Sequence, residues 1–151
     1  MTVRLDANRV APEGRKAMAG LQAYVNQSGI EASLLELLKI RASQINGCAF
    51  CLAMHMRDAR RLGEREERLD LLPAWRDAPI YTPRERAALA WTEAVTLVAD
   101  GYVPNAVYEA ARQEFGEKEL VDLTYAVVAI NGWNRLAVAF RRPPEVGGAT
   151  S

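Results

Sequence analysis

Apolar residues recur every three or four positions along most of the chain, whereas strand-like alternation is hard to find. Ala17, Leu21 and Val25 lie four residues apart in one segment, and Leu34 and Leu38 repeat this spacing in the next. Residues three and four apart share one face of an α-helix, so the pattern predicts helices with one buried side. Alanine, leucine, glutamate and arginine are frequent and favour helices. The pattern therefore predicts an all-α fold.

Glycine, proline and capping residues divide this pattern into separate helices. The strongest start signal is Thr82, which caps a helix, followed by Pro83 at the first helical position and Glu85 to complete a capping box. Gly63 is placed to end another helix in the left-handed conformation. The predicted helices cover about residues 12–26, 31–44, 47–62, 64–72, 83–99, 104–115 and 117–141, and residues 73–81 are expected to form a loop.

Length and composition are those of one globular domain. A chain of 151 residues has the usual size of a single domain, and it buries roughly 70% of the surface of the unfolded chain. Apolar residues make up 50% and charged residues 25%, which is ordinary for a globular protein. We expect one helical domain over residues 1–142 and, after the Pro143–Pro144 pair, a flexible tail over residues 143–151.

The charges are balanced, with 19 basic and 19 acidic residues and no basic run. This balance predicts no nucleic-acid partner and no acidic-membrane partner. The N-terminus lacks the apolar segment of a signal peptide, and no stretch approaches the roughly 18 apolar residues of a membrane span. We therefore expect a cytoplasmic protein, in which a Cys-x-x-Cys pair is more often catalytic or metal-binding than a structural disulfide.

Both cysteines and the single histidine lie within eight consecutive positions, as Cys48, Cys51 and His55. The thiolate is the reactive form of cysteine, and a second thiol nearby can close a disulfide with it. On a helix that turns about 100° per residue, His55 lies roughly 20° and Cys51 roughly 60° from Cys48. Ala59 and Leu62 continue this stripe, so it is expected to face protein. The spacing is what dithiol redox chemistry requires.

Each thiol is expected in a different environment. Cys48 falls in the first turn of the helix, where unpaired N–H groups and the helix dipole stabilise an anion. Cys51 lies four residues before His55, within reach of a base. Glu36 is surrounded by leucines on the preceding helix, and we expect it to reach towards His55 or Cys51, directly or through a water. The attacking cysteine stays open, with a slight preference for Cys48 as the more exposed thiol that meets external partners.

Simpler interpretations stand beside these. The two cysteines are alternatively small buried hydrophobes, or they bind zinc together with His55 and Glu36, although structural zinc usually takes two separated ligand pairs. His55 is alternatively a core histidine bonded to a backbone carbonyl. Glu36 is alternatively one half of a surface pair with Lys39.

The last predicted helix is apolar on more than one side, with eight apolar residues close together: Leu120, Val121, Leu123, Ala126, Val127, Val128, Ala129 and Ile130. Such a helix is either central in the fold or buried by a neighbouring subunit. Its polar and aromatic end, Asn131, Trp133, Asn134 and Arg135, is interpreted as packing and subunit contact.

The order Glu36, Cys48-x-x-Cys51, His55 resembles the motif of the AhpD-like alkylhydroperoxidases in the carboxymuconolactone decarboxylase superfamily. Residues 37–47, which lead into the cysteines, and residues 129–135 are similar to that family as well. The resemblance covers about residues 15–142, and the spacing of four functional residues makes it specific.

The resemblance implies an AhpD-like helical bundle that assembles into a homo-oligomer, a trimer or a hexamer. It also implies that hydroperoxides are reduced by a Cys48–Cys51 dithiol cycle without haem, flavin or metal. Glu36 and His55 would form a proton relay, and a lipoyl group or thioredoxin-like protein would supply the external dithiol. The decarboxylase branch typically lacks the cysteine pair, which favours the peroxidase branch. The alternatives are a redox-sensing or thiol-buffering module without turnover, and a decarboxylase-like enzyme.

Overall fold

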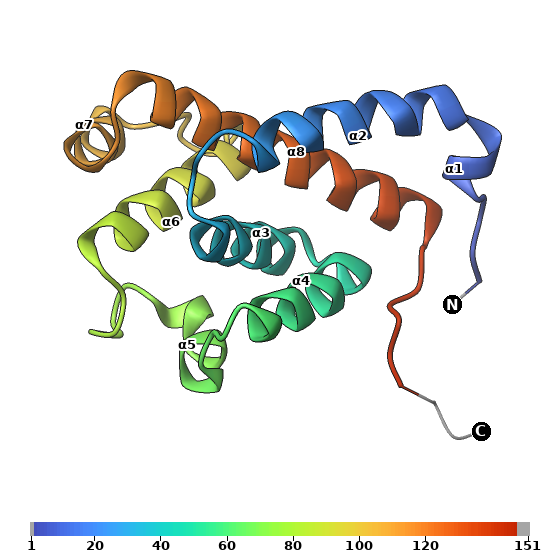
Figure 1. The fold of residues 1–151 in the computed structure, drawn as a ribbon, viewed down its shortest axis with the longest axis horizontal. Helices are drawn as coiled ribbons and strands as arrows, with labels where there is room; N and C mark the ends of the chain where they lie inside the picture. Colours follow the sequence, from blue (N-terminus) through green and yellow to red (C-terminus); the bar gives the residue numbers. More distant parts are fainter. Residues whose placement is uncertain (1, 148–151) are drawn as a thin grey trace.

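The structure, a computed structural model, describes residues 2–147, and over this range it contains helices and no strand (Figure 1). The predicted all-α fold is confirmed. The elements are α1 (Ala7–Val10), α2 (Pro12–Asn26), α3 (Ala32–Asn46), α4 (Ala49–Arg61), α5 (Glu66–Asp70), the 3₁₀ helix η1 (Leu72–Ala74), α6 (Pro83–Thr96), α7 (Asn105–Glu114) and α8 (Glu117–Phe140). None of the helices in this range is long and apolar enough to cross a membrane.

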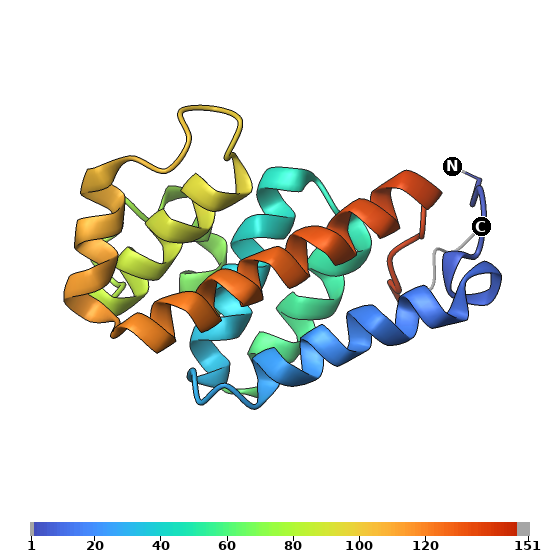
Figure 2. The same ribbon diagram turned by 90° about the horizontal axis from the view of Figure 1, so that it is seen from above.

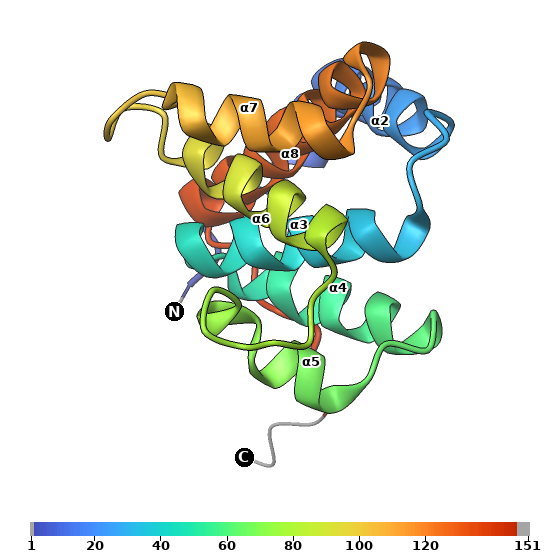
Figure 3. The ribbon, with the colours of Figure 1, turned by 90° about the vertical axis from the view of Figure 1, so that its left-hand side faces the viewer.

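The helices form three layers. Helices α2, α7 and α8 make one outer layer, α3 and α6 lie in the middle, and α4 and α5 make the other outer layer (Figures 1 and 3). The long helix α8 contacts α2, α3, α4, α6 and α7, and Figure 2 shows it crossing the length of the molecule. One apolar cluster fills the space around α8, and a second lies between α3 and the segment from α5 to α6.

The middle position of α3 explains its unusual burial. Every side chain from Leu34 to Ile40 is buried, because α4 packs against one side of the helix and α6 and α8 pack against others. This run includes two charged residues, Glu36 and Lys39, with exposed fractions of 9% and 8%. A charged group in such a position needs a partner, since an unpaired buried charge is costly.

Most predicted helix boundaries agree with the structure to within a few residues. The capping box of Thr82 and Glu85 is present at the start of α6. Gly63 follows α4 with a positive φ of 89°, and Gly47 ends α3 in the left-handed conformation. The short helix α1 was not predicted, and η1 begins at the last residue of a predicted helix and extends into the expected loop.

After α8 the chain reverses direction. Arg141 adopts a positive φ of 56°, and residues 144–147 then lie beside the outer face of α4. Glu145 comes within 3.7 Å of the Arg57 guanidinium on that face. Residues 148–151 of the predicted flexible tail lie outside the described residues, and its flexibility stays a prediction.

Candidate functional site

The turn between α3 and α4 places Cys48 at the start of α4. Gly47 turns the chain in the left-handed conformation, and Cys48 then has the extended φ and ψ of an N-cap residue. Its Sγ accepts a hydrogen bond from the backbone N–H of Cys51, at 3.3 Å. Cys48 was predicted inside the first helical turn. The structure places it one step earlier, as the cap, where its sulfur receives an N–H that the helix leaves unpaired.

Both thiols are buried and close together. Cys48 is 2% exposed and Cys51 is 1% exposed, and both are free cysteines in the larger apolar cluster. The expected exposure of Cys48 is therefore not found, because both thiols are buried to nearly the same degree. A helix end is usually open to solvent, but α8 packs against α4 and this cluster encloses the cap.

The two thiols differ in acidity. The hydrogen bond from the Cys51 thiol to the Cys48 sulfur contributes most to lowering the pKa of Cys48. Together with the backbone N–H groups of Cys51 and Phe50 and the amide of Asn134, it lowers this pKa to about 7. The same hydrogen bond, together with burial, raises the pKa of Cys51. Ionisation of the pair around neutral pH therefore begins at Cys48, while Cys51 keeps its proton.

One turn further along α4, His55 is bonded to Glu36. The His55 Nδ1 lies 3.0 Å from Glu36 Oε2, and Lys39 Nζ lies 3.0 Å from Glu36 Oε1. Burial raises the pKa of Glu36, but the hydrogen bond from His55 and the positive charge of Lys39 outweigh it, so the pKa is lowered. The predicted approach of Glu36 to His55 is confirmed, and His55 bonds to this carboxylate rather than to a backbone carbonyl.

The alternative pairing of Glu36 with Lys39 is also present, but it is buried rather than on the surface. The four predicted residues thus form two pairs. Cys48, Cys51 and His55 share one stripe of α4, which Ala59 continues while Leu62 is exposed, and Glu36 reaches His55 from α3. Within residues 2–147, no hydrogen bond joins His55 directly to either sulfur. The two pairs are neighbours along the helix rather than a continuous chain of hydrogen bonds.

Asn134 belongs to the site, although the sequence interpretation treated it as packing and subunit contact. Its side chain is completely buried inside the subunit, so it cannot contact another copy. Its Nδ2 donates to Ser43 Oγ at 3.0 Å, and its Oδ1 accepts from Asn46 Nδ2 at 3.0 Å. The sequence offered one signal for this role, a polar asparagine within an apolar helix. That signal does not show that α8 packs beside the thiols.

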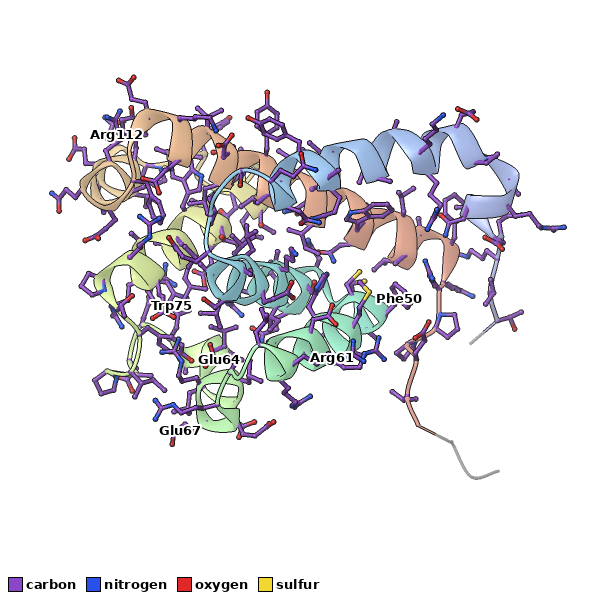
Figure 4. The ribbon with its side chains drawn as sticks, viewed as in Figure 1. Phe50, Arg61, Glu64, Glu67, Trp75 and Arg112 are labelled. Carbon is purple, nitrogen blue, oxygen red and sulfur yellow. The ribbon has the colours of Figure 1, made fainter. Side chains whose placement is uncertain are left out.

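Figure 4 shows Phe50 at the start of α4, on the side nearest the end of α8. The guanidinium of Arg142, just beyond α8, lies 3.8 Å from the centre of this ring. Phe50 is half-buried and packs against the apolar cluster that contains the thiols. This aromatic side chain therefore closes the edge of the thiol site.

Within the described part of the chain, the group of side chains best placed to bind a metal ion is Glu36, His55 and Asp58, whose ligand atoms lie within 4.8 Å of one another. This group contains neither thiol, so it differs from the zinc site considered from the sequence. Lys39 holds one oxygen of Glu36, and Arg61 lies 3.5 Å from Asp58. These two cations already balance the carboxylates, which disfavours a divalent ion.

Relatives of this chain are found by sequence. The profile of the carboxymuconolactone decarboxylase family matches residues 12–94, which is more than half of the chain. An uncharacterized protein, YdfG, from Bacillus subtilis (strain 168) is 43% identical over 139 residues, covering 92% of this chain and 95% of the relative.

Solved structures show the same fold. A protein of unknown function from Agrobacterium tumefaciens, whose description proposes an antioxidant defence protein AhpD, is 42% identical with a TM-score of 0.94, covering 97% of this chain and 100% of that chain. An uncharacterized peroxidase-related protein from Ralstonia eutropha JMP134, described as having an alkylhydroperoxidase AhpD core, is 20% identical. Its TM-score is 0.80, and the match covers 92% of this chain and 74% of that chain. At this identity the match shows a similar fold and nothing more.

The family profile, the sequence of YdfG and the Agrobacterium structure agree with the helical architecture and with one another. The chain belongs to the carboxymuconolactone decarboxylase family and has its AhpD-like helical fold.

Proposed function

We propose that this protein is a thiol peroxidase, which reduces hydroperoxides through a Cys48–Cys51 dithiol cycle. The observation that carries the proposal is the asymmetry of the thiol pair. One sulfur caps a helix with its pKa lowered to about 7, and the other keeps its proton 3 residues further along the same helix. An attacking thiolate beside a protonated resolving thiol is the arrangement that dithiol peroxide reduction needs.

In the first step, the Cys48 thiolate attacks the O–O bond of the hydroperoxide. A sulfur–oxygen bond forms, the O–O bond breaks, and two electrons pass from sulfur to the peroxide. Cys48 becomes a sulfenic acid, and the alkoxide leaves and takes up one proton to give the alcohol. The N–H groups that stabilise the thiolate at the helix start also hold the sulfur in place for this attack.

In the second step, Cys51 attacks the sulfenic acid of Cys48 and forms the disulfide, releasing water. The raised pKa of Cys51 means that it needs a base in order to attack. His55 lies one helical turn beyond Cys51, and Glu36 holds its Nδ1, so the other nitrogen is free to take this proton. The proton then passes to the departing hydroxide. Glu36 and His55 thereby serve the resolving thiol rather than the attacking one.

An external dithiol completes the cycle. It transfers two electrons to the Cys48–Cys51 disulfide, restores the thiolate and the thiol, and leaves as a disulfide with the release of one proton. A lipoyl group or a thioredoxin-like protein has the required chemistry. Such a cycle belongs in a reducing compartment, so we propose a cytoplasmic setting.

Access to the buried thiols requires a local movement. We infer that Phe50 moves aside, because it is half-buried at the edge of the cluster while the thiols themselves are enclosed. We also propose that the protein is a homo-oligomer, a trimer or a hexamer. Part of α8 supports this, since Val121, Tyr125 and Val128 are 54%, 46% and 49% exposed and lie on one face of the helix. Sedimentation that showed only a monomer would contradict this part.

The first experiment exposes the reduced protein to a slight excess of tert-butyl hydroperoxide and maps the thiols by mass spectrometry. We expect a rapid loss of about 2 Da, located to a Cys48–Cys51 disulfide and reversed by dihydrolipoamide. In Cys51→Ser, dimedone should trap a sulfenic acid on Cys48. In Cys48→Ser, peroxide consumption should fall by about 10³-fold or more.

Thiols that stay reduced, or that oxidise no faster than in the unfolded protein, would contradict the peroxidase proposal. A disulfide that changes the size of the oligomer without peroxide turnover would instead favour a redox-sensing module. Activity on a carboxylated lactone that survives replacement of both cysteines by serine would favour a decarboxylase-like enzyme.

A further inference from the structure

We propose that Asn134 is a further catalytic residue of this site, and that one N–H of its side-chain amide donates to the reactive Cys48 sulfur. The inference rests on the proposed thiol chemistry. In this proposal a residue of α8, far from the cysteine motif in sequence, stabilises the Cys48 thiolate and the sulfenate that forms from it.

Asn134 lies in the part of the core that contains the thiols. On α8 it lies between Ile130, one turn before, and Ala137, one turn after, and both belong to the same apolar cluster as Cys48 and Cys51. Its side chain is 0% exposed, so water cannot serve as its partner from bulk solvent. An amide in such an apolar surrounding is costly unless each of its polar atoms is paired.

A count of hydrogen bonds leaves one donor of this amide unassigned. The carbonyl oxygen accepts from Asn46, and one N–H donates to Ser43 Oγ. An asparagine amide has two N–H groups, so a second one remains. Within residues 2–147, no nitrogen or oxygen atom accepts it. The apolar cluster on this side of α8 contains Cys48 and Cys51, so a cysteine sulfur is the acceptor that the surroundings offer for the second N–H.

The effect of the amide on the thiols agrees with this assignment. The hydrogen bond from Cys51 contributes most to the low pKa of Cys48, and the Asn134 amide lowers it further. The hydrogen bond to Cys48 and burial raise the pKa of Cys51, and there too the Asn134 amide acts in the lowering direction. An N–H donor stabilises the charged form of a thiol and so lowers its pKa, which agrees with an amide N–H directed towards the sulfurs.

The network around Asn134 fixes this orientation. If the amide were reversed, its NH₂ group would face the NH₂ group of Asn46, and its oxygen would face Ser43. The Ser43 hydroxyl already donates its proton to the carbonyl of Lys39, at 2.7 Å. The reversed amide would therefore lose both bonds. A donor that is held in place before the reaction stabilises developing negative charge without the cost of reorienting.

The test measures thiol ionisation rather than peroxide turnover, so it is decided separately from the proposed function. The rate of Cys48 alkylation by iodoacetamide is followed against pH in Cys51→Ser, with and without Asn134→Asp. The carboxylate keeps the shape of the amide but replaces the donor by a negative acceptor. We expect alkylation at pH 6.5 to fall about tenfold or more, and to return to the parent rate at pH 9.5.

Asn131→Ser is the matched control. Asn131 is a second asparagine of α8, and it also bonds to Asn46. Its own amide donates elsewhere, to Thr96 and to the carbonyl of Val127. We expect its pH profile to match the parent within about twofold. Asn134→Ser, which removes the donor without adding charge, should show a smaller shift than Asn134→Asp in the same direction. A folded Asn134 variant with the parent profile would overturn the proposal.

A measurement on the unmutated protein avoids the question of folding. The side-chain amide protons of Asn134 should shift in ¹⁵N-edited NMR spectra as Cys48 titrates, with a midpoint near pH 7. Those of Asn131 should stay constant over the same range. An Asn134 amide that does not respond when Cys48 ionises would also overturn the proposal.

Discussion

Two charge clusters that are largely shielded from solvent have similar components and different outcomes. In the loop cluster, Arg68 donates to Glu64 at 2.7 Å, to Glu85 and to the backbone carbonyl of Ile80. In the thiol-side cluster, Glu36 joins Lys39 and His55 at 3.0 Å each. Both are largely shielded from solvent, with side-chain exposures between 10% and 15% for the charged groups.

The difference lies in what each cluster leaves unpaired. Arg68 places its donors on three different partners and its guanidinium over the Tyr81 ring, which ties the loop before α6 to α5. Glu64, just before α5, lies near the end of α4 (Figure 4). The thiol-side cluster instead contains an imidazole ring with one nitrogen uncommitted, one helical turn beyond Cys51. A fully paired cluster serves the fold, and an incompletely paired one is available for proton transfer.

The largest expected effect comes from breaking the loop cluster. Arg68→Met removes the cation of this cluster and leaves two half-buried carboxylates without their main partner. We expect a loss of about 3 kcal/mol of unfolding free energy, because the remaining shielded charges are uncompensated. Chemical denaturation measures this loss. Cys48 alkylation at neutral pH should be unchanged, and an altered thiol reactivity would show that the two clusters are coupled.

The second effect concerns the thiol-side cluster. His55→Gln keeps a donor towards Glu36 but removes the base. We expect disulfide formation after peroxide addition to slow by about 30-fold, because Cys51 then has no base to take its proton. Stopped-flow measurement of tryptophan fluorescence, checked by quenching and mass spectrometry, follows this step. The initial formation of sulfenic acid should change less than threefold. Equal slowing of both steps would place His55 on the attacking thiol instead.

The smallest effect is the pH dependence of Cys48 itself. Its pKa is lowered to about 7 by the hydrogen bond from Cys51 and by backbone and amide donors, so the thiolate fraction rises as the pH rises through 7. Alkylation of Cys48 should therefore increase about fivefold from pH 6 to pH 7 and level off above pH 8. A rise that continued to pH 9 would mean an ordinary thiol.

The same shift links thiol ionisation to stability. The pKa of Cys48 is depressed in the folded state, so its ionisation contributes stability that is fully present above the unfolded pKa near 9 and is lost as the pH falls through about 7. Cys48→Ser should reduce this pH dependence of the unfolding free energy. The Arg68 variant should keep it, because it leaves Cys48 and the donors around the Cys48 sulfur in place.

Local patterns in the sequence determined much of the fold. Three signals act over only three or four residues: the capping box at Thr82, the glycine after α4 and the spacing of the apolar residues. Because they are local, they predict the helices without knowledge of any tertiary contact. The stripe of Cys51, His55 and Ala59 on α4 is also local, because it follows from the turn of a single helix. The approach of Glu36 to His55 was predictable because one short turn joins their helices.

The tertiary structure decided which groups are enclosed and which meet across the layers. The burial of Cys48 depends on α8, and Asn134 lies 86 positions after Cys48 along the chain, too far for any local pattern to relate them. Lys39 is buried because α3 occupies the middle layer, although its sequence position looks like that of a surface residue. Helix formation depends on neighbouring residues, but desolvation and hydrogen bonding at the thiols depend on where distant helices pack, which only the folded chain specifies.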